Sequence, residues 1–232
     1  MRLKIKLDIL VIGAHPDDAE IGCGGTIARH KQLGYKIGIL DCSNGEPTPH
    51  GSPEIRLEEA GHAAKILDID TRETLDMKNR YIENSIENRI KVADIIRKYQ
   101  PKIIITHPPE DWHADHVAVN KIVSAAKFQA KLTKTDSPYD EFYPPRIVYF
   151  DHAHARIQRK IDFLVNISDT IDVKIRALNA YKSQFIDNRD NRAIFDFIKD
   201  KASFLGQQAG IQFAEGFSMP EYFLVQDITT II

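Results

Sequence analysis

Cysteine is scarce in this chain: its 232 residues include two, Cys23 and Cys42, and no C-x-x-C pair. A disulfide framework is therefore not expected, and the reducing cytoplasm is the natural location. No apolar run approaches the length of a membrane-spanning helix. The first residues, "MRLKIKLDILVIG", continue straight into "AHPDD" without a plausible cleavage site, so they predict a first strand and not a signal peptide. We expect a cytoplasmic protein with no membrane partner.

An excess of charge of one sign is also lacking, since 31 Lys and Arg residues face 33 Asp and Glu residues. No basic run offers a surface for nucleic acid, so none is expected as a partner. Repeats and low-complexity tracts are absent as well. Hydrophobic residues make up 43% of the chain, which is enough for a sizeable core. The length suits one large α/β domain.

Apolar runs alternate with helical patterns along the chain. Strands are expected at 6–14, 35–43, 71–77, 102–107 and 146–150, and helices at 20–34, 54–67, 83–100 and 116–132. This alternation predicts an α/β, Rossmann-like fold, a mostly parallel sheet with helices on both faces. We expect a single domain over 1–232, with its core in 1–150. Residues 151–232 extend it with a strand-like "FLVNI", helices at about 168–184 (N-cap Ser168) and 191–208, and an extended tail.

Two polar clusters follow buried strands. "HPDD" supplies His15, Asp17 and Asp18, and "HADH" supplies His113, Asp115 and His116. Ligands of doubly wound sheets bind beyond the carboxyl ends of the strands, so both clusters are expected at one edge. No Lys or Arg stands beside the adjacent aspartates, and a divalent metal would balance their charge. Two imidazoles and one carboxylate suit a catalytic zinc site with an open position for water.

Each cluster also has a simpler interpretation. His15 and Asp18 could cap the following helix, and "HADH" could be a solvated first turn. The glycines of "GCGGT" do not match the G-x-G-x-x-G dinucleotide fingerprint. Arg56 could be a helix-surface residue that pairs with Glu58 or Glu59. The two clusters together, on the same side of one sheet, favour the metal site.

The residues resemble the PIG-L/LmbE-like family of zinc-dependent N-acetylglucosaminyl deacetylases. "AHPDDAEIGCGGT" resembles its first signature, "HADH" resembles its H-x-D-H signature, and "GEPTPHGSPEIRLEEA" and "SDTIDVKIRALNAYKSQF" are similar to further segments. The similarity runs from the first strand to near the C-terminus. Within the family it is greatest to the bacillithiol biosynthesis branch, which removes acetate from N-acetylglucosaminyl malate. Related deacetylases form hexamers or smaller assemblies, so the resemblance implies a homo-oligomer.

The resemblance also implies roles for individual residues. It makes His15, Asp18 and His116 the ligands of Zn²⁺, with Fe²⁺ as an alternative metal. It makes Asp17 the general base, and His113 the general acid or the group that stabilises the oxyanion, with Asp115 orienting its ring. Glu46 and Arg56 match positions that contact the sugar. Asn79 stands where the family has an aspartate, so its part in substrate binding is where this chain departs from the pattern.

Amide hydrolysis needs an activated water, a stabilised oxyanion and a protonated leaving amine, and this set of residues offers one group for each. Other substrates remain open: diacetylchitobiose, another N-acetylated glucosaminide or a modified antibiotic. The competing class is a non-catalytic α/β module that binds a sugar or a nucleotide. Asp17 and His113 beside the ligands argue against that module, since binding alone requires neither.

Overall fold

A seven-stranded sheet forms the centre of the molecule, in the order β3-β2-β1-β4-β5-β7-β6. The computed structural model describes residues 5–151, 157, 159–191, 193–222, 224–227 and 229. The strands are β1 (Ile9–Gly13), β2 (Ile37–Asp41), β3 (Thr71–Thr74), β4 (Ile103–Thr106), β5 (Arg146–Phe150), β6 (Phe163–Asn166) and β7 (Ala214–Ser218). The first five pair in parallel, and β7 is antiparallel to both β5 and β6.

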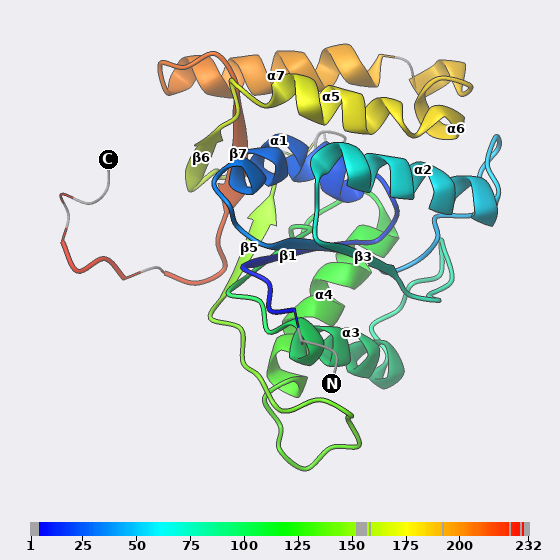
Figure 1. The fold of residues 1–232 in the computed structure, drawn as a ribbon, viewed down its shortest axis with the longest axis vertical. Coiled ribbons are helices and arrows are strands. Elements are labelled where there is room, and N and C mark those ends of the chain that lie inside the picture. The colour runs from blue at the N-terminus through cyan, green and yellow to red at the C-terminus, as the bar shows by residue number, and fades with distance from the viewer. Residues whose placement is uncertain are drawn as a thin grey trace.

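Helices cover both faces of this sheet (Figure 1). On one face lie α1 (Asp18–Gln32) and α2 (Pro53–Leu67), and outside them α5 (Ile171–Asn179), α6 (Lys182–Phe185) and α7 (Ile194–Gln208). A short 3₁₀ turn, Arg189–Asn191, precedes α7. On the other face lie α3 (Ile86–Tyr99) and α4 (Ala114–Gln129). The expected α/β, Rossmann-like architecture is confirmed.

Strand β1 shows why the sheet is buried on both faces. Its alternate residues enter two separate cores, because successive side chains of a strand point to opposite sides. Ile9 and Val11 pack in the core under α1 and α2, whereas Leu10 and Ile12 pack in the core with α3 and α4. The whole strand is buried, which explains its continuous apolar sequence.

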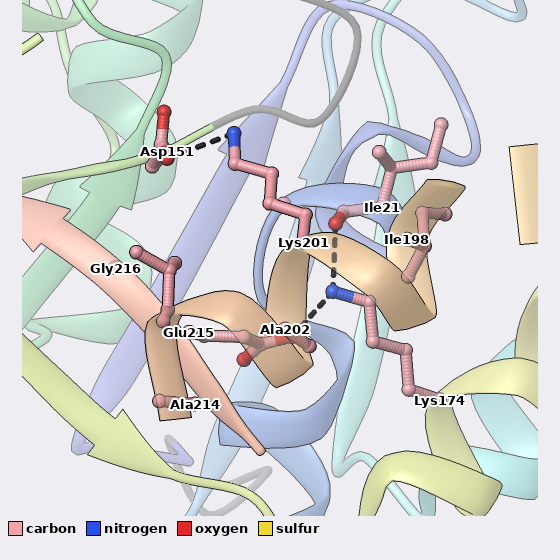
Figure 2. A pocket seen from close by; sticks show the side chains of 11 residues that line it. Ile21, Asp151, Lys174, Ile198, Lys201, Ala202, Ala214, Glu215 and Gly216 are labelled. Carbon is pink, nitrogen blue, oxygen red and sulfur yellow. Dashed lines mark hydrogen bonds and ion pairs between the residues drawn. The ribbon is translucent and has the colours of Figure 1, made fainter. Parts of the chain in front are cut away.

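Helix α1 is interrupted at Cys23, whose φ of −150° and ψ of 27° are not helical. An interruption of this kind leaves helix backbone groups that need other partners. The amides of Gly25 and Thr26 donate to the two carboxylate oxygens of Glu215 in β7, and Lys174 Nζ in α5 donates to the carbonyl of Ile21. Lys174 also pairs with Glu215, and both are buried (Figure 2). This ion pair bridges the break in α1.

The C-terminal third departs from expectation in two places. The helix predicted over 168–184 is divided into α5 and α6 at Tyr181, whose buried hydroxyl donates to Glu20. Thr170 is the N-cap residue of α5, while the Ser168 hydroxyl accepts from the amide of Phe213. The tail, predicted to be merely extended, contains β7 within the sheet. Among the described residues, no helix has the length and apolar character needed to cross a membrane.

Candidate metal centre and substrate pocket

The two polar clusters meet at the carboxyl ends of β1 and β4, which are neighbours in the sheet. From β1 the chain passes to α1 on one face, and from β4 it passes to α4 on the other, so the crevice lies at a topological switch point. His15, Asp17 and Asp18 follow β1, while His113, Asp115 and His116 begin α4. The structure therefore brings together all six residues predicted from these two motifs.

His15, Asp18 and His116 offer ligand atoms that all lie within 4.8 Å of one another. Asp18 Oδ2 is 3.5 Å from His15 Nδ1, and Asp18 Oδ1 is 3.3 Å from His116 Nε2. A tetrahedral zinc ion with bonds of 2.0–2.1 Å separates its ligand atoms by roughly 3.3 Å. The donor set and its spacing thus fit a zinc ion bound by three protein ligands.

Each histidine of this candidate ligand set is held through its other ring nitrogen. His15 Nε2 lies 3.1 Å from Asp115 Oδ2, and His116 Nδ1 lies 3.1 Å from Asp111 Oδ2. Carboxylates in this outer position fix the ring and its tautomer at metal sites. The Asp115 carboxylate was expected to orient His113. That prediction is corrected here, because the carboxylate contacts His15. The backbone amide of Asp115 donates to His113 Nδ1 instead.

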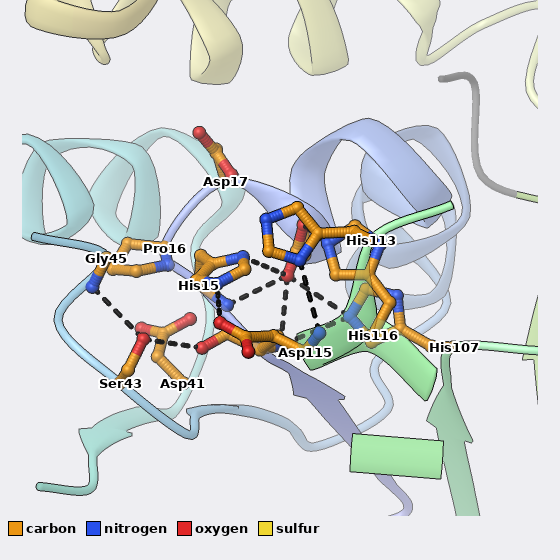
Figure 3. Close-up of polar contacts among 12 residues, drawn as sticks. His15, Pro16, Asp17, Asp41, Ser43, Gly45, His107, His113, Asp115 and His116 are labelled. Atoms are coloured by element: carbon orange, nitrogen blue, oxygen red, sulfur yellow. Dashed lines mark hydrogen bonds and ion pairs between the residues drawn. The ribbon is translucent and has the colours of Figure 1, made fainter. Parts of the chain in front are cut away.

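Two residues of the cluster were missed from the sequence. Asp111 precedes the "HADH" motif, and nothing in "PPEDW" distinguished it from a loop carboxylate. His107, the residue after β4, stacks on His116 with ring centroids 4.0 Å apart and lies 3.1 Å from Asp18 Oδ2 (Figure 3). Burial lowers the pKa of His107 to about 4, which keeps the ring neutral. In the sequence, the one signal that pointed to His107 was its position directly after a buried strand.

The electrostatics of the cluster favour a cation. Burial alone would lower the pKa of His15, but hydrogen bonds to Asp115 and Asp18 raise it to about 9. Burial alone would also lower the pKa of His116, but the charge of Asp18 and the contact with Asp111 raise it to about 10. The carboxylates thus surround the two imidazoles with enough negative potential to hold positive charge, and a divalent ion suits that position.

Asp17 is held beside this cluster in a strained conformation, with a φ of 114° at the N-cap of α1. Burial raises the pKa of its carboxyl group to about 7, and the charge of Arg56 acts to lower it. Arg56 Nη1 and Nη2 each lie 3.4 Å from Asp17 Oδ2, and Nη2 also donates to the Pro16 carbonyl. Arg56 therefore fixes the "HPDD" loop. It does not pair with Glu59, which accepts from Ser183.

His113 caps α4 and lies 4.6 Å from His116 and 4.8 Å from His15, measured between ring centroids. Because an amide N–H can only donate, its bond to His113 Nδ1 leaves the ring proton on Nε2. Burial and the neighbouring histidines lower the pKa of His113, so the ring is neutral near pH 7. A neutral imidazole with Nε2–H is a hydrogen-bond donor.

A polar pocket of about 210 Å³ opens next to the cluster. Its lining comes from four loops and two helices: His15, Asp17, Gly45, Pro47, Thr48, Arg56, Asn79, Arg80, His113 and Gln184. Arg56 and Asn79 line it as predicted, and the Asn79 amide donates to the Gly45 carbonyl. Glu46 is not among the lining residues; its carboxylate accepts from the amide and the hydroxyl of Thr48, and its Oε1 lies 4.0 Å from Arg56 Nε.

The PIG-L family model, described as GlcNAc-PI de-N-acetylase, matches residues 10–127, which span both "HPDD" and "HADH". The chain belongs to the PIG-L family. The crystal structure of the conserved protein TT1542 from Thermus thermophilus shares 34% identity and a TM-score of 0.86, and the match covers 94% of this chain and 97% of that one. This PIG-L member therefore has its fold in common with TT1542 over nearly the whole chain.

Two curated relatives carry names of deacetylases. Diacetylchitobiose deacetylase from Thermococcus kodakarensis is 29% identical over 93% of this chain and 84% of its own length. The probable N-acetyl-alpha-D-glucosaminyl L-malate deacetylase 2 from Bacillus subtilis is 26% identical over 78% of this chain and 84% of its own length. Both names are those of deacetylases, and the substrates that the two names give differ.

Proposed function

We propose that this protein is a metal-dependent hydrolase that removes the N-acetyl group from an N-acetylglucosaminide, with N-acetylglucosaminyl malate, of bacillithiol biosynthesis, as the substrate. One observation carries the reaction class: His15, Asp18 and His116 stand at the spacing of zinc ligands at the edge of a polar pocket. The names of the two relatives support an N-acetylated amino sugar. Diacetylchitobiose is the alternative substrate.

The residues of the pocket divide the work of amide hydrolysis. When bound, a divalent metal supplies Lewis acidity, which polarises a carbonyl and acidifies water. The Asp17 carboxylate takes a proton from the attacking water and gives it to the leaving nitrogen as the C–N bond breaks, releasing acetate and the free amine. His113 donates from Nε2 to the carbonyl oxygen as negative charge develops there. Arg56 holds Asp17 in place.

The test is acetate release by metal-defined protein. Chelated protein and protein reloaded with Zn²⁺ or Fe²⁺ would be assayed on N-acetylglucosaminyl malate, diacetylchitobiose and free N-acetylglucosamine. We expect hydrolysis to require metal, to be fastest on the malate glycoside and to be lost in His116→Ala. Full activity of chelated protein would refute the metal role, and a preference for diacetylchitobiose would refute the malate assignment.

Light scattering tests the proposed homo-oligomer, and cell fractionation tests the cytoplasmic location.

A further inference from the structure

Arg80 stands at the pocket with a backbone conformation that its side chain does not favour. Its φ is +69°, in the left-handed region that is unfavourable for a residue with a Cβ atom. The backbone has a clear reason for this shape: the amides of Arg80 and Ile82 donate to the two carboxylate oxygens of Asp115, which orients His15. Glycine would meet that demand without strain. The arginine side chain therefore needs a separate explanation.

The side chain of Arg80 is exposed and lines the pocket. Its Nη2 donates to the carbonyl of Pro47, which also lines the pocket. Among the lining residues that the structure describes, Arg56 is the other permanent cation, and it is buried against Asp17. The Arg80 guanidinium contacts a neutral carbonyl, so it keeps donors for another acceptor. The pocket thus presents one solvent-facing positive charge beside the candidate metal.

We infer that Arg80 is a specificity-determining residue that binds an anionic substituent on the sugar, a carboxylate or a phosphate. This inference rests on the proposed function for the sugar, and it adds the residue that recognises the charged group attached to it. A guanidinium suits both anions because its parallel N–H groups match their paired oxygens. Its contact with the Pro47 carbonyl places the guanidinium at the pocket wall, where it can meet a group attached to the sugar.

Three glycosides separate the possibilities: N-acetylglucosaminyl malate, N-acetylglucosamine 1-phosphate and neutral methyl N-acetylglucosaminide. For Arg80→Gln we expect kcat/KM to fall about 10- to 100-fold on the anionic glycoside that the pocket prefers and less than threefold on the methyl glycoside. Added salt should weaken the wild-type preference and leave the variant unaffected. Arg80→Lys should restore only part of the loss. Lys78→Gln is the matched control, because it removes an exposed charge from the same loop without lining the pocket.

Two further measurements make the result decisive. Arg80→Gly should keep or raise the Tm while losing the preference, because glycine relieves the backbone strain. Isothermal titration calorimetry measures how tightly each of the three compounds binds, whether or not it is hydrolysed. Anionic glycosides that bind more tightly than the methyl glycoside, yet release no acetate, would refute the proposed function and support Arg80. Equal losses on charged and neutral glycosides, or equal binding of all three by the wild type, would overturn the role of Arg80.

Discussion

Asp17 and Asp18 are adjacent residues that face different partners, and this difference gives the sharpest test at the residue scale. Asp18 lies between His15 and His116, whereas Asp17 lies against Arg56. Asp17→Asn should keep the metal and lose about 10²–10⁴-fold in kcat, as expected for removal of a general base. Asp18→Ala should lose the metal itself, with activity only partly recovered in excess zinc. Metal stoichiometry and kcat measured on both variants decide the matter.

The reverse pattern would contradict this assignment. Should Asp17→Asn lose the metal while Asp18→Ala retains it, the two roles are exchanged and the account of "HPDD" is wrong. Asp17→Glu is a useful companion, since it preserves the charge but displaces the carboxylate from Arg56.

Asp111 contacts His116, one of the proposed metal ligands, and is not itself in the proposed ligand set. Replacing such an outer partner typically lowers metal affinity 10- to 100-fold. We expect Asp111→Asn to show a loss of that size in competition with a chromophoric chelator. Glu110→Gln is the control, because Glu110 is the adjacent carboxylate and is exposed. Equal affinities for the two variants would remove Asp111 from the site.

The site was predictable where a motif lies at the start of the helix that follows a buried strand. Both His/Asp clusters have that position, so their meeting at one sheet edge follows from topology. The target of the Asp115 carboxylate was not predictable, because it depends on how α4 is rotated against β1. Asp111 and Arg80 depend on loops, and their local sequence carries no periodic signal. Glu46 stays a predicted sugar contact: its carboxylate accepts from Thr48, and its Oε1 lies 4.0 Å from Arg56 Nε.

At the scale of elements, α1 packs more closely on the sheet than a side chain would allow. A Cβ added at Gly22 would lie 2.6 Å from the ring of Phe150 in β5. Gly22→Ala should therefore destabilise the protein by about 1–3 kcal/mol through overpacking, even though alanine is the better helix former. Urea denaturation measures the change. Gly61→Ala in α2 is the matched control, because nothing lies within 4 Å of its added Cβ.

For Gly61→Ala we expect a gain of up to about 1 kcal/mol from helix propensity alone. If Gly22→Ala destabilises the protein and Gly61→Ala stabilises it, the contact with Phe150 accounts for the difference between the two substitutions. If Gly22→Ala also stabilises the protein, the packing of α1 on β5 is looser than described.

Elements with a strong apolar pattern were predicted, and those fixed by distant contacts were not. Helix α3 and strand β4 have clear periodicity or continuous burial, and both lie where expected. Strand β7, "AEGFS", carries glycine and a charged residue, and its place depends on Glu215 reaching the amides of α1. The division between α5 and α6 depends on burial of Tyr181, which no local pattern reveals.

At the scale of the whole molecule, the Lys174–Glu215 pair connects the C-terminal third to the helix that carries Asp18. Removing one partner of a buried ion pair typically costs about 3–5 kcal/mol, because the other charge is left unpaired. Lys174→Met should lower the free energy of unfolding by that amount in urea. Lys91→Met removes a lysine from a surface cluster with Asp76 and Glu87, and should cost no more than about 1 kcal/mol.

Similar losses in Lys174→Met and Lys91→Met would indicate that the break in α1 is stable without its bridge. A large loss in Lys174→Met with metal affinity preserved would separate the stability of the sheet from the geometry of the site.

The placement of β7 also has a consequence for biosynthesis. Chains emerge from the ribosome at about 5–20 residues per second, and their earlier parts begin to fold first. Here β7 lies inside the sheet between β5 and β6, although it follows both in the chain. A nascent chain that ends before Ala214 therefore exposes the edges of β5 and β6 and lacks the carboxylate that the amides of Gly25 and Thr26 require. The sheet can therefore close only after Ala214–Ser218 has left the ribosome, and until then the edges of β5 and β6 that pair with β7 remain open.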